Sequence, residues 1–179
     1  MTEVAKKYDA VSQLFHWLTV LFVILMLATG FGRDFVPFSA RDQLMNLHKS
    51  FGLTILFVTV LRIVWRAFRD APPLPDTTPL PQKMAAHATH AFIYAMLIVL
   101  PLTGWMMVSC FGKPLSFFGA FDIAAIAEKD RVRAVVTKNV HEILAFLLSG
   151  LIAAHIGAAV FHHFIQKDGL INRMIPYRK

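Results

Sequence analysis

Four long runs of apolar residues divide the chain, and shorter polar segments separate them. The runs cover about residues 11–32, 46–67, 85–110 and 140–166. At a rise of about 1.5 Å per residue, each run is long enough to cross a bilayer core of about 30 Å as a helix. The pattern predicts an all-α fold. We expect one integral membrane domain, residues 1–179, built as a four-helix bundle.

The connecting segments differ in kind. Five prolines between Ala71 and Lys83 predict an extended connector between the second and third helices. Pro101 lies inside the third run, where a membrane helix tolerates a kink. The longest connector, residues 111–139, carries apolar residues at rough helical spacing among charged ones. This spacing predicts a short interfacial helix in the connector between the third and fourth spans.

Composition and charge support a membrane protein. The chain is 56% hydrophobic and only 16% charged, whereas a soluble domain averages about 25% charged residues. The net charge of +7 invites a nucleic-acid function, but the basic residues lie at the ends of the apolar runs, where lipid headgroups are. We therefore exclude nucleic acid as a partner and expect contact with membrane lipid. No small-residue cleavage site is evident after the basic start, so the first run is interpreted as an uncleaved helix.

The number of spans places both termini on one side of the membrane. Of the 18 Lys and Arg residues, ten fall on the side of the termini and eight on the opposite side. The ten lie closer to helix ends, which predicts a multi-pass membrane protein with both termini in the cytoplasm. These ten are Lys6, Lys7, Arg62, Arg66, Arg69, Lys83, Lys167, Arg173, Arg178 and Lys179.

Histidines inside the spans are the candidate ligands of a metal cofactor. With alternating spans, His48 and His141 lie near the outer face, whereas His16 and His155 lie further in. His141 and His155 are 14 residues apart, so at about 100° per residue they share one face of the last helix. The topology predicts two histidine pairs, His48 with His141 and His16 with His155. Such pairs suit the axial ligation of haem iron, and a haem with two protein ligands transfers electrons.

Other residues refine this hypothesis. The single Cys110 excludes a CxxCH motif, so the haems would be non-covalent and of b type. Arg62 and Arg66 are candidates for neutralising haem propionates, and simple anchoring at the membrane surface is the alternative. His162 lies seven residues after His155 on the same face and could bond a propionate or a quinone carbonyl. Either His87 or His90 could replace one of the two inner ligands. The roles of His87, His90 and His163 otherwise stay open.

Several stretches resemble the bacterial cytochrome b561 family. They are FHW around His16, NLHKSFG around His48, RIVWR at residues 62–66, HATHAFIYAMLIVLPLTGW in the third run, HE at His141 and GLIAAHIGAAVFHHF around His155. Together they cover almost the whole chain. The resemblance implies a four-helix bundle with two b haems on the same two histidine pairs. It also implies ubiquinone near the inner haem, in contact with His162.

The same resemblance implies an activity, superoxide:ubiquinone oxidoreductase, with superoxide as the outer electron donor. A positive outer surface would speed the encounter with this small anion. The basic residues available for it are Arg33, Arg41, Lys49, Lys113, Lys129, Arg131, Arg133 and Lys138. Two alternatives stay open. One is a haem-b, quinone-reducing membrane subunit of a hydrogenase or dehydrogenase. The other is a histidine-based transporter or metal-binding bundle, which predicts a colourless protein.

Overall fold

The computed structural model describes residues 7–75 and 78–175, and four long helices dominate this part of the chain. Each of the four is long and apolar enough to cross a membrane. The predicted all-α membrane bundle is therefore confirmed. The helices are α1 (Ala10–Phe31), α2 (Phe38–Ala67), α3 (Leu80–Cys110) and α4 (Arg131–Phe161).

Three helices, α2, α3 and α4, begin at least five residues earlier than the apolar pattern predicts. Helix α2 begins at Phe38, immediately after Pro37, and α3 begins at Leu80, immediately after Pro79. A proline fits at such a boundary because the first N–H groups of a helix lack intrahelical acceptors. The start of α3 therefore takes residues from the proline-rich segment, and the extended connector is shorter than expected.

The prediction of a short interfacial helix within residues 111–139 is wrong. A small antiparallel hairpin occupies this connector, with β1 (Leu115–Phe117) paired to β2 (Phe121–Ile123). Ser50 of α2 holds it, since its hydroxyl accepts the backbone N–H of Phe118 at 2.9 Å. The amphipathic residues that follow belong to α4 itself, because the Asp130 side chain caps that helix through the N–H of Arg133 at 3.0 Å.

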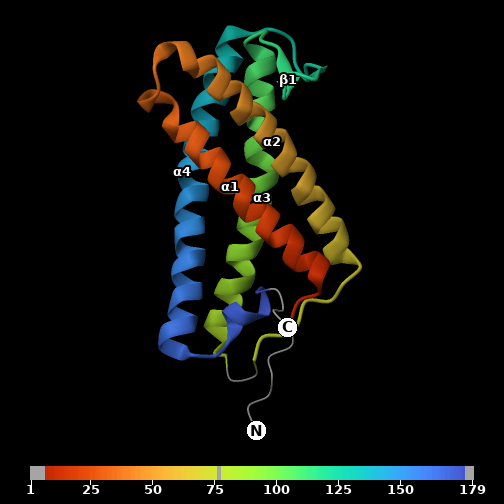
Figure 1. Cartoon of the computed structure of the whole chain (residues 1–179), viewed down its shortest axis with the longest axis vertical. Coiled ribbons are helices and arrows are strands. Elements are labelled where there is room, and N and C mark those ends of the chain that lie inside the picture. Colours follow the sequence, from red (N-terminus) through yellow and green to blue (C-terminus); the bar gives the residue numbers. More distant parts are fainter. Residues whose placement is uncertain (1–6, 76–77, 176–179) are drawn as a thin grey trace.

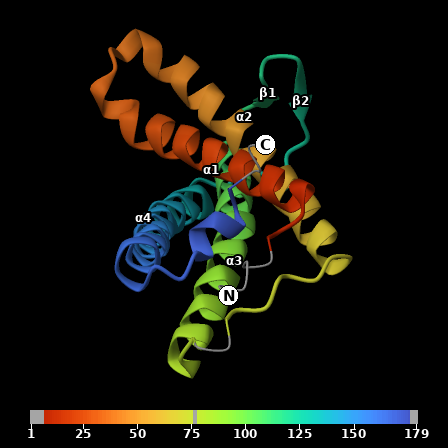
Figure 2. The same ribbon diagram turned by 60° about the horizontal axis from the view of Figure 1, so that its bottom comes forward.

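The four helices form two hairpins that cross obliquely. Figure 1 shows α1–α2 lying across α3–α4, with the β1–β2 hairpin at one end of the bundle. Figure 2, in which the molecule is turned by 60° so that its bottom comes forward, shows the same crossing. The hairpins meet at a small core of four buried side chains, and most other large apolar side chains face outward. Those four are Ile55, Leu97, Leu100 and Leu148.

The two described ends of the chain meet at the end of the bundle away from the β-hairpin. The backbone N–H of Tyr8 donates to the carbonyl of Arg173 at 3.2 Å, and Trp17 Nε1 donates to the Met174 carbonyl at 2.8 Å. This arrangement puts the two described ends of the chain, near Lys7 and Ile175, on one side of the bundle, in agreement with the number of spans. Three of the basic residues counted for that side, Lys6, Arg178 and Lys179, lie outside the described residues.

Asp9 fastens the start of α1 at this end. Its carboxylate accepts the N–H groups of Val11 and Ser12, which caps the helix, and Trp65 of α2 donates to it at 3.1 Å. Partial burial acts to raise the pKa of Asp9, but hydrogen bonds from Ser12, Trp65 and Val11 outweigh it and lower the pKa below its ordinary value.

After α4 the chain turns back under the bundle. A π-helical turn, η2 (His162–Gln166), is followed by Lys167 and Gly169 with φ of 53° and 74°, and then by the 3-10 turn η3 (Leu170–Arg173). π-Helical turns are frequent at functional sites, because the extra residue in the turn redirects side chains. A second 3-10 turn, η1 (Gly32–Phe35), links α1 to α2.

Candidate functional site

His48 of α2 and His141 of α4 face each other near the β-hairpin end. Their ring centroids are 6.3 Å apart and their planes are inclined at 77°. An imidazole nitrogen binds a metal ion at about 2 Å, so two rings on opposite sides of one ion have centres about 6 Å apart. The observed spacing fits such a pair of axial ligands.

A threonine on a neighbouring helix fixes the proton on His141. Thr103 Oγ1 lies 2.7 Å from the Leu100 carbonyl and 3.0 Å from His141 Nδ1. A hydroxyl has one proton, and here Leu100 accepts it, so the hydroxyl accepts from His141 Nδ1–H. The same Nδ1 lies 3.1 Å from the Leu100 carbonyl, a second acceptor. The hydrogen bonds thus assign the proton to Nδ1 and leave the lone pair of Nε2 for a metal ion.

His48 is held in the same way. Thr29 Oγ1 donates to the Leu25 carbonyl at 2.7 Å and lies 3.1 Å from His48 Nδ1. The Met26 carbonyl is a further hydrogen-bond partner of this imidazole. The hydrogen bonds therefore assign the proton of His48 to Nδ1 as well, and both rings of the pair carry an unprotonated Nε2.

Two glycines make room for these rings. A Cβ on Gly30 would lie 3.1 Å from Cε1 of His48, and a Cβ on Gly104 would lie 3.1 Å from Cε1 of His141. Carbon atoms pack best at about 3.5–4.0 Å, so any side chain at either position would press on the imidazole. Each glycine directly follows the threonine that bonds the same histidine.

A second histidine cluster lies nearer the termini. His90 of α3 and His155 of α4 have ring centroids 5.2 Å apart, with planes inclined at 72°. His16 of α1 lies within electrostatic reach of both. The predicted partners His16 and His155 are thus in one cluster, but the ring that contacts His155 is that of His90.

Arg62 occupies the remaining side of this cluster. Its Nη2 lies 3.2 Å from His16 Nδ1, and because a guanidinium only donates, His16 Nδ1 accepts. Arg62 and Arg66 both lie over the ring of Tyr94, at 5.2 and 5.9 Å from its centroid. These arginines, with Arg69 and Asp70, line a pocket at the termini end, where three guanidinium groups outnumber the one carboxylate and so favour an anion.

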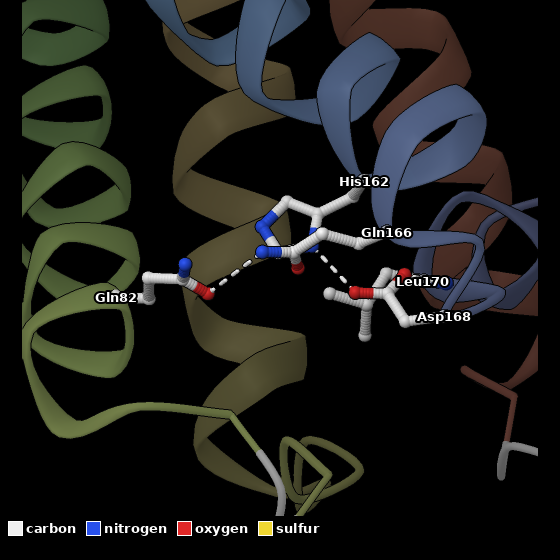
Figure 3. Close-up of polar contacts among 5 residues, drawn as sticks. All are labelled: Gln82, His162, Gln166, Asp168 and Leu170. Atoms are coloured by element: carbon white, nitrogen blue, oxygen red, sulfur yellow. Dashed lines mark hydrogen bonds and ion pairs between the residues drawn. The ribbon is translucent and has the colours of Figure 1, made fainter.

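His162 forms a separate site at the end of α4. Its Nδ1 lies 2.5 Å from Asp168 Oδ2, and both side chains are largely buried, with 18% and 21% exposed. Gln166 donates to Gln82 of α3 at 3.5 Å, which links the turn to α3 beside the imidazole (Figure 3). The Asp168 carboxylate also accepts the N–H of Leu170 at 3.1 Å. His162 is thus an oriented imidazole rather than a freely wetted one.

Sequence reasoning missed several of these residues. Thr29 and Thr103 carry a visible signal, since each begins a Thr-Gly-aromatic triplet and follows a histidine by 13 residues. Asp168 has a weaker signal, a Lys-Asp-Gly turn after the last span. His87 is exposed on α3, and the His163 ring packs on Phe164 at 4.7 Å between centroids.

The basic residues predicted for the opposite end have varied partners. Arg133 lies 3.6 Å from the Asp130 carboxylate, and Lys138 lies 2.6 Å from that of Glu142. Lys49 donates to the Pro114 carbonyl at 3.3 Å. These contacts reduce the positive field at this end, because two of its cations are neutralised by carboxylates.

Two pairs of histidine rings lie against each other, His48 with His141 and His90 with His155. Within residues 7–75 and 78–175, no group of three or more His, Cys, Asp or Glu side chains could hold a metal ion. A haem iron takes its equatorial ligands from the porphyrin and needs only two from the protein, so the donor set at His48 and His141 fits haem.

Comparison with known proteins agrees with this chemistry. The family "Prokaryotic cytochrome b561" matches residues 7–177. Cytochrome b561 homolog 2 of Escherichia coli (strain K12) is 33% identical over 179 residues, covering 97% of this chain and 94% of that protein. Cytochrome b561 homolog 1 of the same organism is 33% identical over 166 residues, covering 92% and 94%. The probable superoxide oxidase CybB of Yersinia pestis is 32% identical over 176 residues, covering 97% and 98%. The chain therefore belongs to the prokaryotic cytochrome b561 family, whose members bind b-type haem and transfer electrons in membranes.

Proposed function

We propose that this protein is a di-haem superoxide:ubiquinone oxidoreductase of the bacterial inner membrane. The observation that carries the proposal is the facing pair of His48 and His141, each with its proton fixed on Nδ1. This pair would hold the outer haem. When bound, each haem supplies a one-electron ferric/ferrous couple.

The inner haem would be held by His16 and His155. Both residues lie in the cluster nearer the termini, with Arg62 and Arg66 beside them to neutralise propionates. For His16 to bind iron through Nε2, its bond to Arg62 has to exchange, because Nδ1 must then carry the proton. His90 contacts His155 directly and is the competing partner, which variants distinguish.

Ubiquinone would bind at the termini end beside His162. Asp168 holds the Nδ1 side of this imidazole, so its Nε2 is left to bond a quinone carbonyl. Gln82 and Gln166 offer amide groups on the α3 side of the ring (Figure 3). In the overall reaction two superoxide anions and one quinone, with two protons, give two dioxygen molecules and one quinol.

Superoxide would arrive at the β-hairpin end, which we place in the periplasm, with both termini in the cytoplasm. The support for this donor is the similarity to a protein named as a probable superoxide oxidase, 32% identical over nearly its whole length. The basic residues of this end, among them Arg33, Arg41 and Lys113, would attract the anion despite the two paired cations.

The first test is the haem content of the purified protein. Absorbance spectra of the oxidised and dithionite-reduced protein, with a pyridine haemochrome assay, should give two low-spin b haems per chain. His141→Ala should lose one haem and keep the other, and His163→Ala should keep both as a matched control. A colourless protein from cells with ample haem would overturn the proposal and favour a transporter.

The second test concerns the donor and the inner ligands. Superoxide generated in solution should drive reduction of a ubiquinone analogue. Haem without this activity would favour the membrane subunit of a hydrogenase or dehydrogenase, which takes electrons from a protein partner. His16→Ala should lose the inner haem and His90→Ala should retain it; the reverse result would replace His16 by His90 as the ligand.

A further inference from the structure

We propose that Thr29 and Thr103 are positioning residues that hold the two axial ligands of the outer haem. Each hydroxyl would fix the proton on Nδ1 of its histidine, orient the ring and so present Nε2 to the iron. This inference rests on the proposed function, because it takes His48 and His141 to be the ligands of one haem.

The strongest support is that the arrangement occurs twice. His16 and His90, Thr29 and Thr103, and Gly30 and Gly104 form three residue pairs, each separated by 74 positions between α1 and α3. His48 and His141 are 93 positions apart, and so are Arg62 and His155, between α2 and α4. The two helical hairpins thus follow one plan, and each places a Thr-Gly pair against a histidine of its own second helix.

The contacts repeat as well as the positions. In both hairpins the threonine hydroxyl donates to a carbonyl in its own helix and accepts from Nδ1, at 3.1 Å for His48 and 3.0 Å for His141. In both, the ring lies against the following glycine. The bond from each hydroxyl to a carbonyl of its own helix does not require a histidine beside it. The contact with a histidine in both hairpins therefore indicates that the threonine serves the histidine.

The expected effect follows from the chemistry of a bound imidazole. An acceptor on Nδ1–H fixes the ring and increases the electron donation of Nε2, which favours the ferric state of the iron. Each imidazole keeps a backbone acceptor, the Met26 or the Leu100 carbonyl, and water cannot easily replace the buried Thr29 hydroxyl, so each variant loses one of two hydrogen bonds. Replacing either hydroxyl by a methyl group should therefore make the outer haem easier to reduce.

The test is a potentiometric titration that resolves the two haems by their electron paramagnetic resonance signals. In Thr103→Val, the ratio of reduced to oxidised outer haem at a fixed ambient potential should rise about three- to tenfold, the equivalent of one neutral hydrogen bond. Thr29→Val should act similarly, and in the double variant the two factors should multiply because both ligands serve one iron. The inner haem should titrate as in the wild type.

Two variants separate positioning from simple packing. Thr103→Ser keeps the hydroxyl and should restore the wild-type ratio. Thr19→Val removes a buried hydroxyl with a similar bond, 2.7 Å to the Phe15 carbonyl, from the helix that carries Thr29 but away from His48. It should leave the outer haem unchanged. A shift of equal size in Thr19→Val, or a serine variant that behaves like the valine variant, would overturn the inference.

The failure of this inference is distinguishable from failure of the proposed function. If His141→Ala removes one haem but Thr29→Val and Thr103→Val leave its potential and its resonance signal unchanged, the ligands stand and the positioning role is wrong. If His141→Ala keeps both haems, the proposed ligand pair itself is wrong. Should a valine variant fail to fold, the alanine variant at the same position replaces it, since it also lacks the hydroxyl; an unchanged ratio of reduced to oxidised outer haem in that variant would overturn the inference.

Discussion

Gly104 offers a sharp test of how closely the bundle fits its histidine. A Cβ at this position would lie 3.1 Å from Cε1 and 3.4 Å from Nδ1 of His141. Restoring ordinary carbon contact requires the ring to move by about 0.4–0.9 Å. Such a shift lengthens the bonds from Nδ1 to Thr103 and Leu100, now 3.0 and 3.1 Å, towards the outer limit of useful hydrogen bonds.

The magnitude follows from this displacement. Overfilling a packed site by one methyl group costs about 1–3 kcal/mol, which corresponds to a loss of about 5- to 150-fold in affinity. In Gly104→Ala we expect the outer haem to bind more weakly by that factor. The inner haem, held elsewhere, should bind as in the wild type.

The assay is a titration of haem-depleted protein with haemin, followed by Soret absorbance. Gly150→Ala is the matched control, since it adds a methyl group inside α4 where nothing lies within 4 Å. The reasoning would be refuted by a Gly104→Ala protein that binds both haems like the wild type, or by an equal loss in Gly150→Ala.

Three further outcomes are expected. Asp168→Asn should keep both haems and slow ubiquinone reduction about ten- to hundredfold, because a charge-assisted hydrogen bond to His162 is lost. Stopped-flow measurement of haem re-oxidation by the quinone gives this rate, and an unchanged rate would remove Asp168 from the site. Asp9→Ala should destabilise the fold by about 1 kcal/mol at pH 7, as loss of a helix cap does. Because the pKa of Asp9 is lower in the folded state, its contribution to the free energy of unfolding is present above the unfolded pKa and is lost as pH falls through the folded pKa. Melting curves of the wild type and the variant in detergent should therefore converge below about pH 4. Superoxide-driven reduction should slow as salt rises, and a rate independent of ionic strength would contradict electrostatic steering.

The spans and the outer histidine pair could be predicted from the sequence because both depend on simple periodicity. Apolar length defined the four helices, and the alternation of their directions brought His48 towards His141. Helix starts were less predictable. Pro37 and Pro79 look like breaks in an apolar pattern, yet each directly precedes a helix. A proline fits there because the first N–H groups of a helix have no acceptor within the helix.

The ligands of the inner cluster could not be predicted from the hydrophobic periodicity of the sequence. Depth alone admits either His16 or His90 beside His155, and the choice depends on side-chain contacts such as the one from Arg62 to His16. Asp168 was missed for a related reason. Its approach to His162 depends on a π-helical turn and two residues of positive φ, which hydrophobic patterns do not encode.

The crossing of the two helical hairpins has a consequence for assembly. Each hairpin consists of two helices that are long and apolar enough to cross a membrane. Among the described residues, the buried core that connects the hairpins has one side chain from α2, Ile55, and three from α3 and α4, with Phe22 and Val23 of α1 partly buried against it. Under the proposed ligand sets, each haem takes one histidine from α1–α2 and one from α3–α4. Bound haem would then hold the two hairpins together and stabilise the folded chain. In cells starved of haem the hairpins should be loosely packed and membrane proteases should degrade the chain, so the haem supply would set the amount of this protein.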